Sequence, residues 1–265
     1  MSSEGVGWLF CPADRPERFA KAAAAADVVI IDLEDGVAPA DRPAAREAIR
    51  SASLDPARTV VRVSPVGTEE HALDLGALTA TPYDRVMLAK TETAEQVASL
   101  APRRVVALCE TPLGVLNAHS IAAGDCVVAM MWGAEDLVAA LGGRSSRDSS
   151  GRYRDVARHA RSSVLLAAGA ARKLAIDSVY LDIADLGGLA AETDDAVASG
   201  FGAKACIHPS QIEVVRARYR PSTEQADWAR RVLHAATSER GVFAFEGRMV
   251  DEPILRHARQ VIARS

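Results

Sequence analysis

The fold is decided by two stretches of sequence, Val105-Val-Ala-Leu-Cys-Glu-Thr111 and Val127-Val-Ala-Met-Met-Trp-Gly-Ala-Glu-Asp136. Both are too short and too rich in β-branched residues to be read first as helices, so we predict strands. A strand that is apolar on both faces is typical of a parallel sheet covered by helices. Glu110 and Asp136 would then lie at the C-terminal ends of two such strands, where α/β proteins usually place their chemistry.

Two carboxylates at neighbouring strand ends repel each other unless a cation lies between them. A hard ion that prefers oxygen ligands, such as Mg²⁺, is the natural candidate, and Glu110 and Asp136 are its predicted ligands. The alternative is that each carboxylate only caps the helix that follows it, because acidic side chains suit helix N-termini. From these two stretches alone, both interpretations stay open.

Further runs of strand length surround these two. They are Trp8–Pro12, Val28–Asp35, Thr59–Ser64, Arg85–Lys90, Ser178–Ile183 and Ala203–Pro209. Each run is followed by sequence of helical character, and this alternation predicts a parallel sheet with helices outside. Eight such units in about 220 residues fit an α/β fold of the closed (β/α)₈ TIM-barrel type. An open doubly wound sheet is the alternative, but Cys11-Pro-Ala-Asp-Arg15 is not the glycine-rich turn that usually follows its first strand.

The predicted TIM-barrel domain takes up residues 1–220, with a long helix at about 153–175 before the seventh strand. A C-terminal helical arm, residues 221–265, follows it with helices near 223–238 and 252–263. The arm carries the large aromatic residues Trp228, Phe243 and Phe245, and apolar surface of this kind needs a partner. We therefore expect the arm to pack on its own barrel or on a neighbouring subunit. The polar loop Gly142–Arg152 is read as a mobile cover over the barrel mouth or as an ordinary surface loop.

The composition, with 49% hydrophobic and 25% charged residues, is that of an ordinary globular protein. A net charge of −4 without a basic block argues against nucleic acid as a partner. No apolar run is long enough to span a membrane, and no signal peptide is recognised. The cysteines Cys11, Cys109, Cys126 and Cys206 form no C-x-x-C pair, which favours free thiols. We therefore expect a cytoplasmic protein.

Charged and titratable side chains gather at the predicted strand ends. They are Arg15, Asp32, Glu34, Asp35, Arg62, Lys90, Glu110, Asp136 and His208. Charges are seldom buried unless they are paired or used. Arg62 stands inside an apolar strand, which suggests that it holds a substrate carboxylate or an oxyanion formed during a reaction. A structural ion pair with Glu34 or Asp35 is the alternative.

Three further residues of this set have more than one possible role. Asp32 and Glu34 share one face of their strand, so they could orient Arg62 or Lys90, or hold metal-bound waters. Lys90 is a candidate Schiff-base lysine, but the two metal-type carboxylates favour a metal mechanism. His208 is interpreted as a packed, hydrogen-bonded residue rather than as a base.

Short motifs along nearly the whole chain resemble those of a known family. They are Asp14-Arg-Pro-Glu-Arg-Phe19, Ile31-Asp-Leu-Glu-Asp35, Val61-Arg-Val63, Glu110-Thr111, Trp132-Gly-Ala-Glu-Asp-Leu137, Cys206-Ile-His-Pro-Ser210 and Gly247-Arg-Met-Val-Asp251. With these motifs the chain resembles the citrate lyase β-subunit-like proteins of the HpcH/HpaI aldolase superfamily, which also contains malyl-CoA and citramalyl-CoA lyases. The chain departs from the usual pattern at Ala13, Ser64 and Ala89, which bears on substrate choice more than on reaction type.

The resemblance implies a TIM barrel with Mg²⁺ on Glu110 and Asp136, and Mn²⁺ as a possible substitute. It implies a lyase that reversibly cleaves a 3-hydroxyacyl-CoA into an acyl-CoA and a 2-oxo acid. The expected partners are therefore a CoA thioester and a 2-oxo acid. A malate synthase-like enzyme that also hydrolyses the thioester is one alternative, and a non-catalytic citrate lyase-type subunit that needs an acyl-carrier partner is another.

Site residues follow from the same resemblance. The expected substrate contacts are Arg62, Glu110, Arg15 and Lys90. Arg62 would also stabilise the enolate oxygen of the thioester. Asp251 on the arm is the expected acid that protonates the enolate carbon, and the base in the reverse direction. We expect the arm to carry Asp251 into a neighbour's site in a homotrimer, with a hexamer as the alternative.

Overall fold

The computed structural model describes residues 5–239 and 241–265. The chain divides into two compact units, and the boundary between Val215 and Arg216 falls inside helix α10 (Pro209–Tyr219). In the described ranges no helix combines the length and the apolar character needed to cross a membrane.

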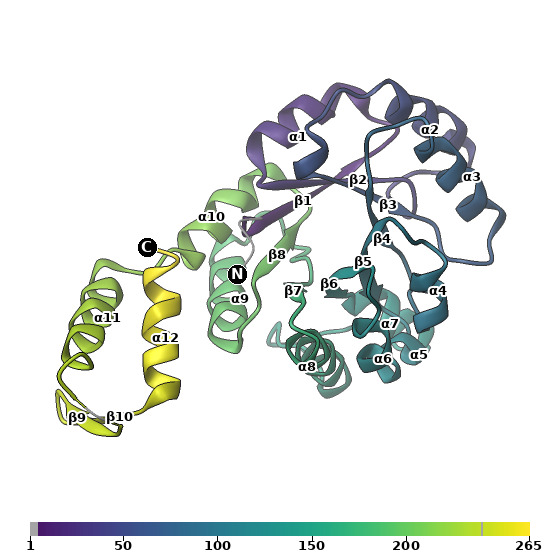
Figure 1. Cartoon of the computed structure of the whole chain (residues 1–265). Coiled ribbons are helices and arrows are strands. Elements are labelled where there is room, and N and C mark those ends of the chain that lie inside the picture. Colours follow the sequence, from purple (N-terminus) through teal and green to yellow (C-terminus); the bar gives the residue numbers. More distant parts are fainter. Residues whose placement is uncertain (1–4, 240) are drawn as a thin grey trace. The chain divides into compact units, whose positions relative to one another are not determined.

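The first unit is a closed barrel of eight strands, drawn from purple to green in Figure 1. The strands are β1 (Gly7–Pro12), β2 (Val28–Asp32), β3 (Thr59–Val63), β4 (Arg85–Leu88), β5 (Arg104–Cys109), β6 (Val127–Trp132), β7 (Leu174–Asp177) and β8 (Ala203–Cys206). Each strand pairs in parallel with the next, and β8 closes the barrel by pairing with β1, where Leu9 lies opposite Cys206. The predicted TIM barrel is therefore confirmed.

Helices connect the strands and surround them (Figure 1). They are α1 (Phe19–Ala25), α2 (Arg42–Ser51), α3 (Glu69–Leu78), α4 (Ala94–Ala98), α5 (Pro112–Leu116), α6 (Ala118–Ala122), α7 (Ala134–Ala140), α8 (Asp155–Ala170) and α9 (Leu186–Ser199). Both faces of the strands are apolar: Val60 and Met87 belong to one buried cluster, whereas their neighbours Val61 and Val86 are buried outside it. This explains the continuous apolar runs of the sequence, because a parallel barrel buries both faces of each strand.

The predicted position of the seventh strand is wrong. β7 is Leu174–Asp177, and the run Ser178–Ile183 is not a strand. The preceding helix α8 ends at Ala170 instead of near residue 175, and Arg172 adopts a positive φ of 56° just beyond that end. Leu181 and Ile183 in the run are 54% and 43% exposed, so its strand-like composition does not serve the barrel.

The second unit contains two helices joined by a hairpin. These elements are α11 (Thr223–Ala235), β9 (Phe243–Phe245), β10 (Arg248–Val250) and α12 (Glu252–Ile262). The helices match the prediction, whereas the hairpin was not predicted. Trp228, Phe243 and Phe245 pack against this unit's own buried cluster, so these aromatics do not by themselves require an outside partner. Val242 and Met249 on the hairpin, in contrast, are 65% and 66% exposed.

A buried lysine crosslinks the last two strands of the barrel. Lys204 is 0% exposed, and its Nζ lies 3.1 Å from Asp177 Oδ2 and 3.0 Å from Glu192 Oε1. It also donates to the carbonyl of Ser178 at 2.8 Å. These contacts satisfy an ammonium group that burial would otherwise make costly.

Lys204→Met is expected to lower the free energy of unfolding by about 3 kcal/mol, because buried carboxylates lose a partner charge. Urea unfolding of both proteins measures the difference. The matched control is Arg158→Met, which breaks the exposed Arg158–Asp155 pair on α8 and should change stability little. A loss as small as that of the control would show that Lys204 contributes no net stabilisation.

Candidate active site

A buried arginine stands at the end of β3 and forms a two-point ion pair with the end of β2. Arg62 is 9% exposed, and its Nε and Nη2 each lie 2.6 Å from one oxygen of Asp32. Its Nη1 is 3.3 Å from Glu34 Oε2. Burial alone would lower the pKa of Arg62, but the charges of Asp32 and Glu34 raise it, so the guanidinium stays charged. The interpretations of Arg62 as paired and of Asp32 and Glu34 as orienting residues are therefore both compatible with the structure.

Lys90 connects the strand ends on either side of it. Its ammonium contacts Glu34, lies 3.1 Å from Asp35 Oδ2 and lies 3.3 Å from Asp136 Oδ1. Burial would lower the pKa of Lys90, but hydrogen bonding and charge from Glu34 raise it. A Schiff-base lysine needs a depressed pKa. This environment instead favours a Lys90 that stays charged and bridges the carboxylates.

Glu110 is buried within reach of the charge of Asp136. Glu110 is 3% exposed, and burial, followed by the charge of Asp136, raises its pKa to about 8. Glu110 Oε1 accepts a hydrogen bond from the backbone N–H of Lys90 at 3.1 Å. Gly133, which precedes α7, fits against this side chain, because a Cβ there would lie 2.6 Å from Glu110 Oε2.

Helix capping does not explain these two carboxylates. The N-cap of α5 is Thr111, whose hydroxyl accepts from the N–H of Gly114 at 3.0 Å. The N-cap of α7 is Gly133, and no side chain caps that helix. The capping alternative is therefore wrong for Glu110; Asp136 makes no capping hydrogen bond, but it lies in the first turn of α7, where its charge suits the helix N-terminus.

The donor set fits a divalent cation with oxygen ligands. Among the described residues no group of three or more histidine, cysteine, aspartate or glutamate side chains forms a complete metal cage. Mg²⁺ does not need one, because it is usually held by one or two carboxylates together with waters and substrate oxygens. Burial and, after it, the charge of Asp136 raise the pKa of Glu110, and a bound cation would relieve both effects.

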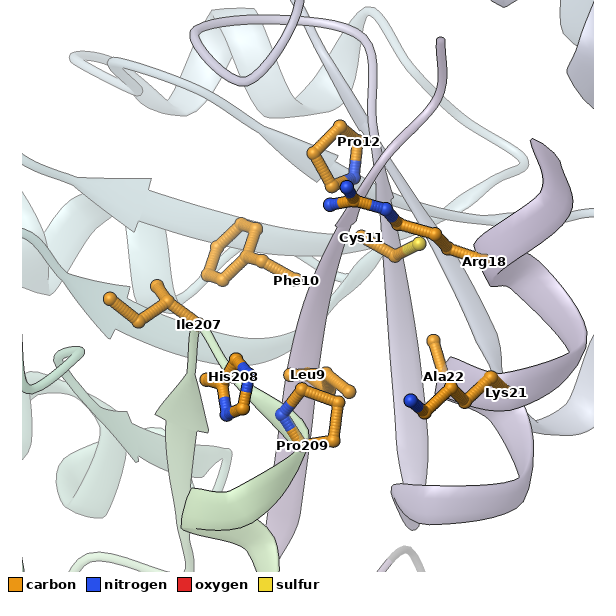
Figure 2. A pocket seen from close by; sticks show the side chains of 10 residues that line it. All are labelled: Leu9, Phe10, Cys11, Pro12, Arg18, Lys21, Ala22, Ile207, His208 and Pro209. Carbon is orange, nitrogen blue, oxygen red and sulfur yellow. The ribbon is translucent and has the colours of Figure 1, made fainter. Parts of the chain in front are cut away.

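A cavity of about 370 Å³ lies beside the C-terminal end of β1 (Figure 2). Its walls come from β1, the 3₁₀ helix Pro16–Arg18, α1 and the segment after β8. The lining residues are Leu9, Phe10, Cys11, Pro12, Arg18, Lys21, Ala22, Ile207, His208 and Pro209. Phe10 also lies next to the site, with its ring centroid 4.9 Å from Arg62 Cζ. The cavity therefore adjoins the barrel mouth and brings two cations to it, Arg18 and Lys21. The sequence reasoning missed both, although Arg18 lies within one of the motifs quoted above.

The remaining predicted residues make other contacts. Arg15 is a neighbour of the cavity in sequence, but its side chain is 56% exposed and its ion-pair partner is Asp14 at 3.6 Å. His208 is exposed at the cavity and has its Nδ1 2.7 Å from Ser210 Oγ. Asp251 is the N-cap of α12 in the second unit, where it accepts from the N–H of Ile254.

Known proteins are similar to this chain over its whole length. A protein of Mycobacterium tuberculosis, "Citrate lyase subunit beta-like protein", is 62% identical over 265 residues, which cover 100% of this chain and 97% of the relative. The crystal structure of protein CitE from the same organism, in complex with magnesium, acetoacetate and coenzyme A, superposes with a TM-score of 0.96. It is 63% identical and covers 99% of this chain and 98% of that one.

More distant relatives include human "Citramalyl-CoA lyase, mitochondrial", which is 29% identical over 89% of this chain and 78% of its own length. The family model described as HpcH/HpaI aldolase/citrate lyase matches residues 7–209, which span the barrel. The chain therefore belongs to the HpcH/HpaI aldolase/citrate lyase family.

Proposed function

We propose that this protein is a Mg²⁺-dependent carbon–carbon lyase that reversibly cleaves a 3-hydroxyacyl-CoA into an acyl-CoA and a 2-oxo acid. The observation that carries the proposal is the pairing of an anion-binding group, Arg62, with a cation-binding pair, Glu110 and Asp136, at one end of the barrel. The crystallised mycobacterial relative contains magnesium, acetoacetate and coenzyme A, and the human relative is named citramalyl-CoA lyase. The ligands of the one relative and the reaction named for the other both suit such a site.

Glu110 and Asp136 would hold the metal, with Mn²⁺ as a substitute. When bound, the ion would supply Lewis-acid polarisation of the oxygen on C3 of the substrate. Lys90 contacts Asp136 through its ammonium and Glu110 through its backbone N–H, so it keeps both carboxylates in place. Lys90 would therefore orient the two metal-binding carboxylates and place a positive charge beside the substrate.

The reaction breaks the bond between C2 and C3 of the thioester. The 3-hydroxyl loses its proton to solvent and becomes the keto group of the 2-oxo acid, while the electrons of the C2–C3 bond form the enolate of the acyl-CoA. Arg62 is charged and fixed by Asp32, so it can stabilise the enolate oxygen without reorganising. Asp251 then donates a proton to C2, and in the reverse direction it removes that proton.

The cavity beside β1 is our proposed place for part of the coenzyme A arm. Arg18 and Lys21 bring two cations to an otherwise largely apolar wall, which suits phosphates joined to an extended chain. Changing both to alanine is expected to raise KM for the CoA ester by about tenfold or more, because charged hydrogen bonds contribute about 1.5–3 kcal/mol each. Steady-state kinetics measure this. Arg50→Ala is the control and should change KM less, because Arg50 lies outside the cavity lining and pairs with Glu47 on α2.

The second unit would complete the site from another chain. Its hairpin exposes Val242 and Met249, apolar side chains that a subunit contact would cover. Asp251 directly follows this hairpin, at the start of α12. These features support a homo-oligomer, which we propose is a trimer or a hexamer, with Asp251 acting in a neighbour's barrel.

Mixing two inactive variants tests action between chains. Asp251→Asn lacks the acid and Glu110→Gln lacks the metal site, so mixed oligomers are expected to regain part of the activity after subunit exchange. Activity is measured before and after exchange, and each variant exchanged with itself is the control. If exchange is proven and no activity returns, each chain builds its own site or Asp251 is not the acid.

The substrate itself is identified with a panel of esters. Initial rates with malyl-, citramalyl-, citryl- and 3-hydroxy-3-methylglutaryl-CoA in Mg²⁺ would show which acyl group the site accepts. We propose a cytoplasmic location, which the free thiols of the chain support, since three of the four cysteines are buried and unpaired.

One relative supports a second candidate. "Citrate lyase subunit beta" of Escherichia coli is 33% identical and covers 91% of this chain, and its name indicates a protein that works with other subunits. A subunit of that kind would need an acyl group on a carrier protein. Turnover of a free CoA ester by the purified single chain would exclude this requirement.

A further inference from the structure

A closed ring of side-chain contacts lies next to the turn that carries Asp136. In order around the ring, its members are Trp132, Asp177, Lys204, Glu192, Arg147 and Tyr153. The proposed mechanism gives none of these six residues a role. They come from β6, β7, β8, α9 and the polar loop that follows α7, so the ring ties distant parts of the chain together.

Half of the ring is polar, and Asp177 and Lys204 in it are fully buried. Trp132 Nε1 donates to Asp177 Oδ1 at 2.8 Å, and Asp177 Oδ2 lies 3.1 Å from Lys204 Nζ. Lys204 is 3.0 Å from Glu192 Oε1, and the other oxygen of Glu192 is 2.7 Å from Arg147 Nη2. Every charge in this half is therefore matched by an opposite charge.

The other half is aromatic. The guanidinium carbon of Arg147 lies 3.7 Å from the ring centroid of Tyr153. Tyr153 in turn meets Trp132 edge to face, with centroids 5.1 Å apart and an interplanar angle of 71°. Arg147 thus joins the two halves on one side, beside a longer contact of 3.5 Å from the Tyr153 hydroxyl to Glu192 Oε1. Trp132 joins them on the other side, because its indole contacts both Asp177 and Tyr153.

The position of Trp132 matters because the metal-binding turn begins immediately after it. Trp132 pairs in register with Cys109, so Gly133 comes beside Glu110. A Cβ on Gly133 would lie 2.6 Å from Glu110 Oε2, so the turn packs tightly against that carboxylate. A shift of Trp132 would therefore change the separation of Glu110 from Asp136.

The same polar loop holds the turn at a second point. Ser146 is 2% exposed, and its hydroxyl donates to Glu135 Oε1 at 2.6 Å. The loop is itself closed by a β-bridge between Arg147 and Tyr153. It is therefore anchored near the site, which differs from the mobile cover considered from the sequence.

We propose that Arg147 is a positioning residue for the divalent cation: through Tyr153 and Trp132 it fixes the turn that presents Asp136 toward Glu110. The inference rests on the proposed function, because it assumes that these two carboxylates bind the ion. Groups that orient metal ligands affect affinity even though they do not touch the metal. Arg147 is the informative member to change, because its side chain is 23% exposed and its removal leaves Glu192 paired with Lys204.

The test is calorimetric titration of the metal-free protein with Mg²⁺, without substrate. Arg147→Gln is expected to bind Mg²⁺ about 10–100-fold more weakly than the unchanged protein. Arg152→Gln is the matched control, because Arg152 lies in the same loop, its side chain is 78% exposed and it pairs with the loop neighbours Asp148 and Ser150. Its Mg²⁺ affinity should equal that of the unchanged protein. Tm is measured for each variant, so that a loss of affinity is compared among folded proteins.

Equal Mg²⁺ affinity of Arg147→Gln and the unchanged protein would overturn the proposal, as would an equal loss in Arg152→Gln. If Arg147→Gln does not fold, Ser146→Ala decides: weakened Mg²⁺ binding supports positioning by the loop, and unchanged binding overturns it. Absence of Mg²⁺ binding by the unchanged protein would instead contradict the proposed metal site itself. The two failures are therefore distinguishable.

Discussion

Glu110→Gln is expected to abolish Mg²⁺ binding and to lower activity by about a hundredfold or more, since a bound metal contributes several kcal/mol to such reactions. The amide has nearly the same shape as the carboxylate but offers the ion only one neutral oxygen. Calorimetry and the rate of acyl-CoA formation measure the two effects. Asp136→Asn is expected to behave in the same way, because the two carboxylates are proposed to share the ion.

The same variant should leave the fold intact and change how stability depends on pH. The pKa of Glu110 is raised from 4.5 to about 8 in the folded, metal-free protein. Between these pH values the folded state binds the proton more tightly than the unfolded state, so this group lowers stability as pH rises. Glu110→Gln removes this contribution, and its Tm should fall less across the window. Glu47→Gln, at an exposed position on α2, is the control.

Full activity of the unchanged protein in EDTA would contradict the metal site. So would a Glu110→Gln protein with normal turnover.

Arg62→Lys is expected to lower kcat by about 10²–10³, the range seen when one donor to a developing oxyanion is lost. Lysine keeps the charge but cannot make the planar two-point contact of Arg62, whose Nε and Nη2 each lie 2.6 Å from one carboxylate oxygen of Asp32. The charge would therefore no longer be fixed where the enolate oxygen forms. Steady-state kinetics with saturating Mg²⁺ and substrate measure the loss.

Arg46→Lys is the matched control for this prediction. Arg46 is also a buried arginine, paired with Asp74 at 2.8 Å and with Glu70, but it lies on α2 rather than at the barrel mouth. The control should lose stability without losing kcat below its Tm. If Arg62→Lys shows the same pattern, Arg62 is a structural residue and the proposed role is wrong.

The barrel was predictable because most of its strands are continuous apolar runs punctuated by charged ends. β7 was not, because Leu174–Asp177 is short and follows the alanine-rich helix α8 without a glycine or proline between them. The adjacent run Ser178–Ile183 has the better strand composition, yet it is not a strand in the closed barrel. Here the tertiary context overrode local preference.

The charged centre of the site was predictable for a related reason. Parallel strands all end on one side, so Arg62, Lys90, Glu110 and Asp136 had to approach one another once the barrel was assumed. The ion-pair partner of Arg62 was harder to choose. The sequence offered Glu34 or Asp35 as a structural pair and Asp32 with Glu34 as orienting residues, and strand register places Asp32 directly opposite Arg62.

The cations of the cavity and the ring around Trp132 could not be predicted. Arg18 belongs to the same motif as Arg15 and its side chain is also largely exposed, yet of the two only Arg18 lines the cavity. The ring unites Trp132 with Arg147 and Lys204, which come from separate elements. These contacts form only in the closed barrel, so no spacing of residues in the sequence predicts them.

A product balance tests the central claim most directly. The purified protein is incubated with its preferred CoA ester and Mg²⁺, and acyl-CoA, 2-oxo acid and free CoA are quantified in the same sample by mass spectrometry. The account predicts acyl-CoA and 2-oxo acid in equal amounts, no free CoA, and no products in EDTA. Free CoA formed in step with turnover would show thioester hydrolysis, and equal product formation in EDTA would show a reaction without a metal; either result would contradict a Mg²⁺-dependent lyase.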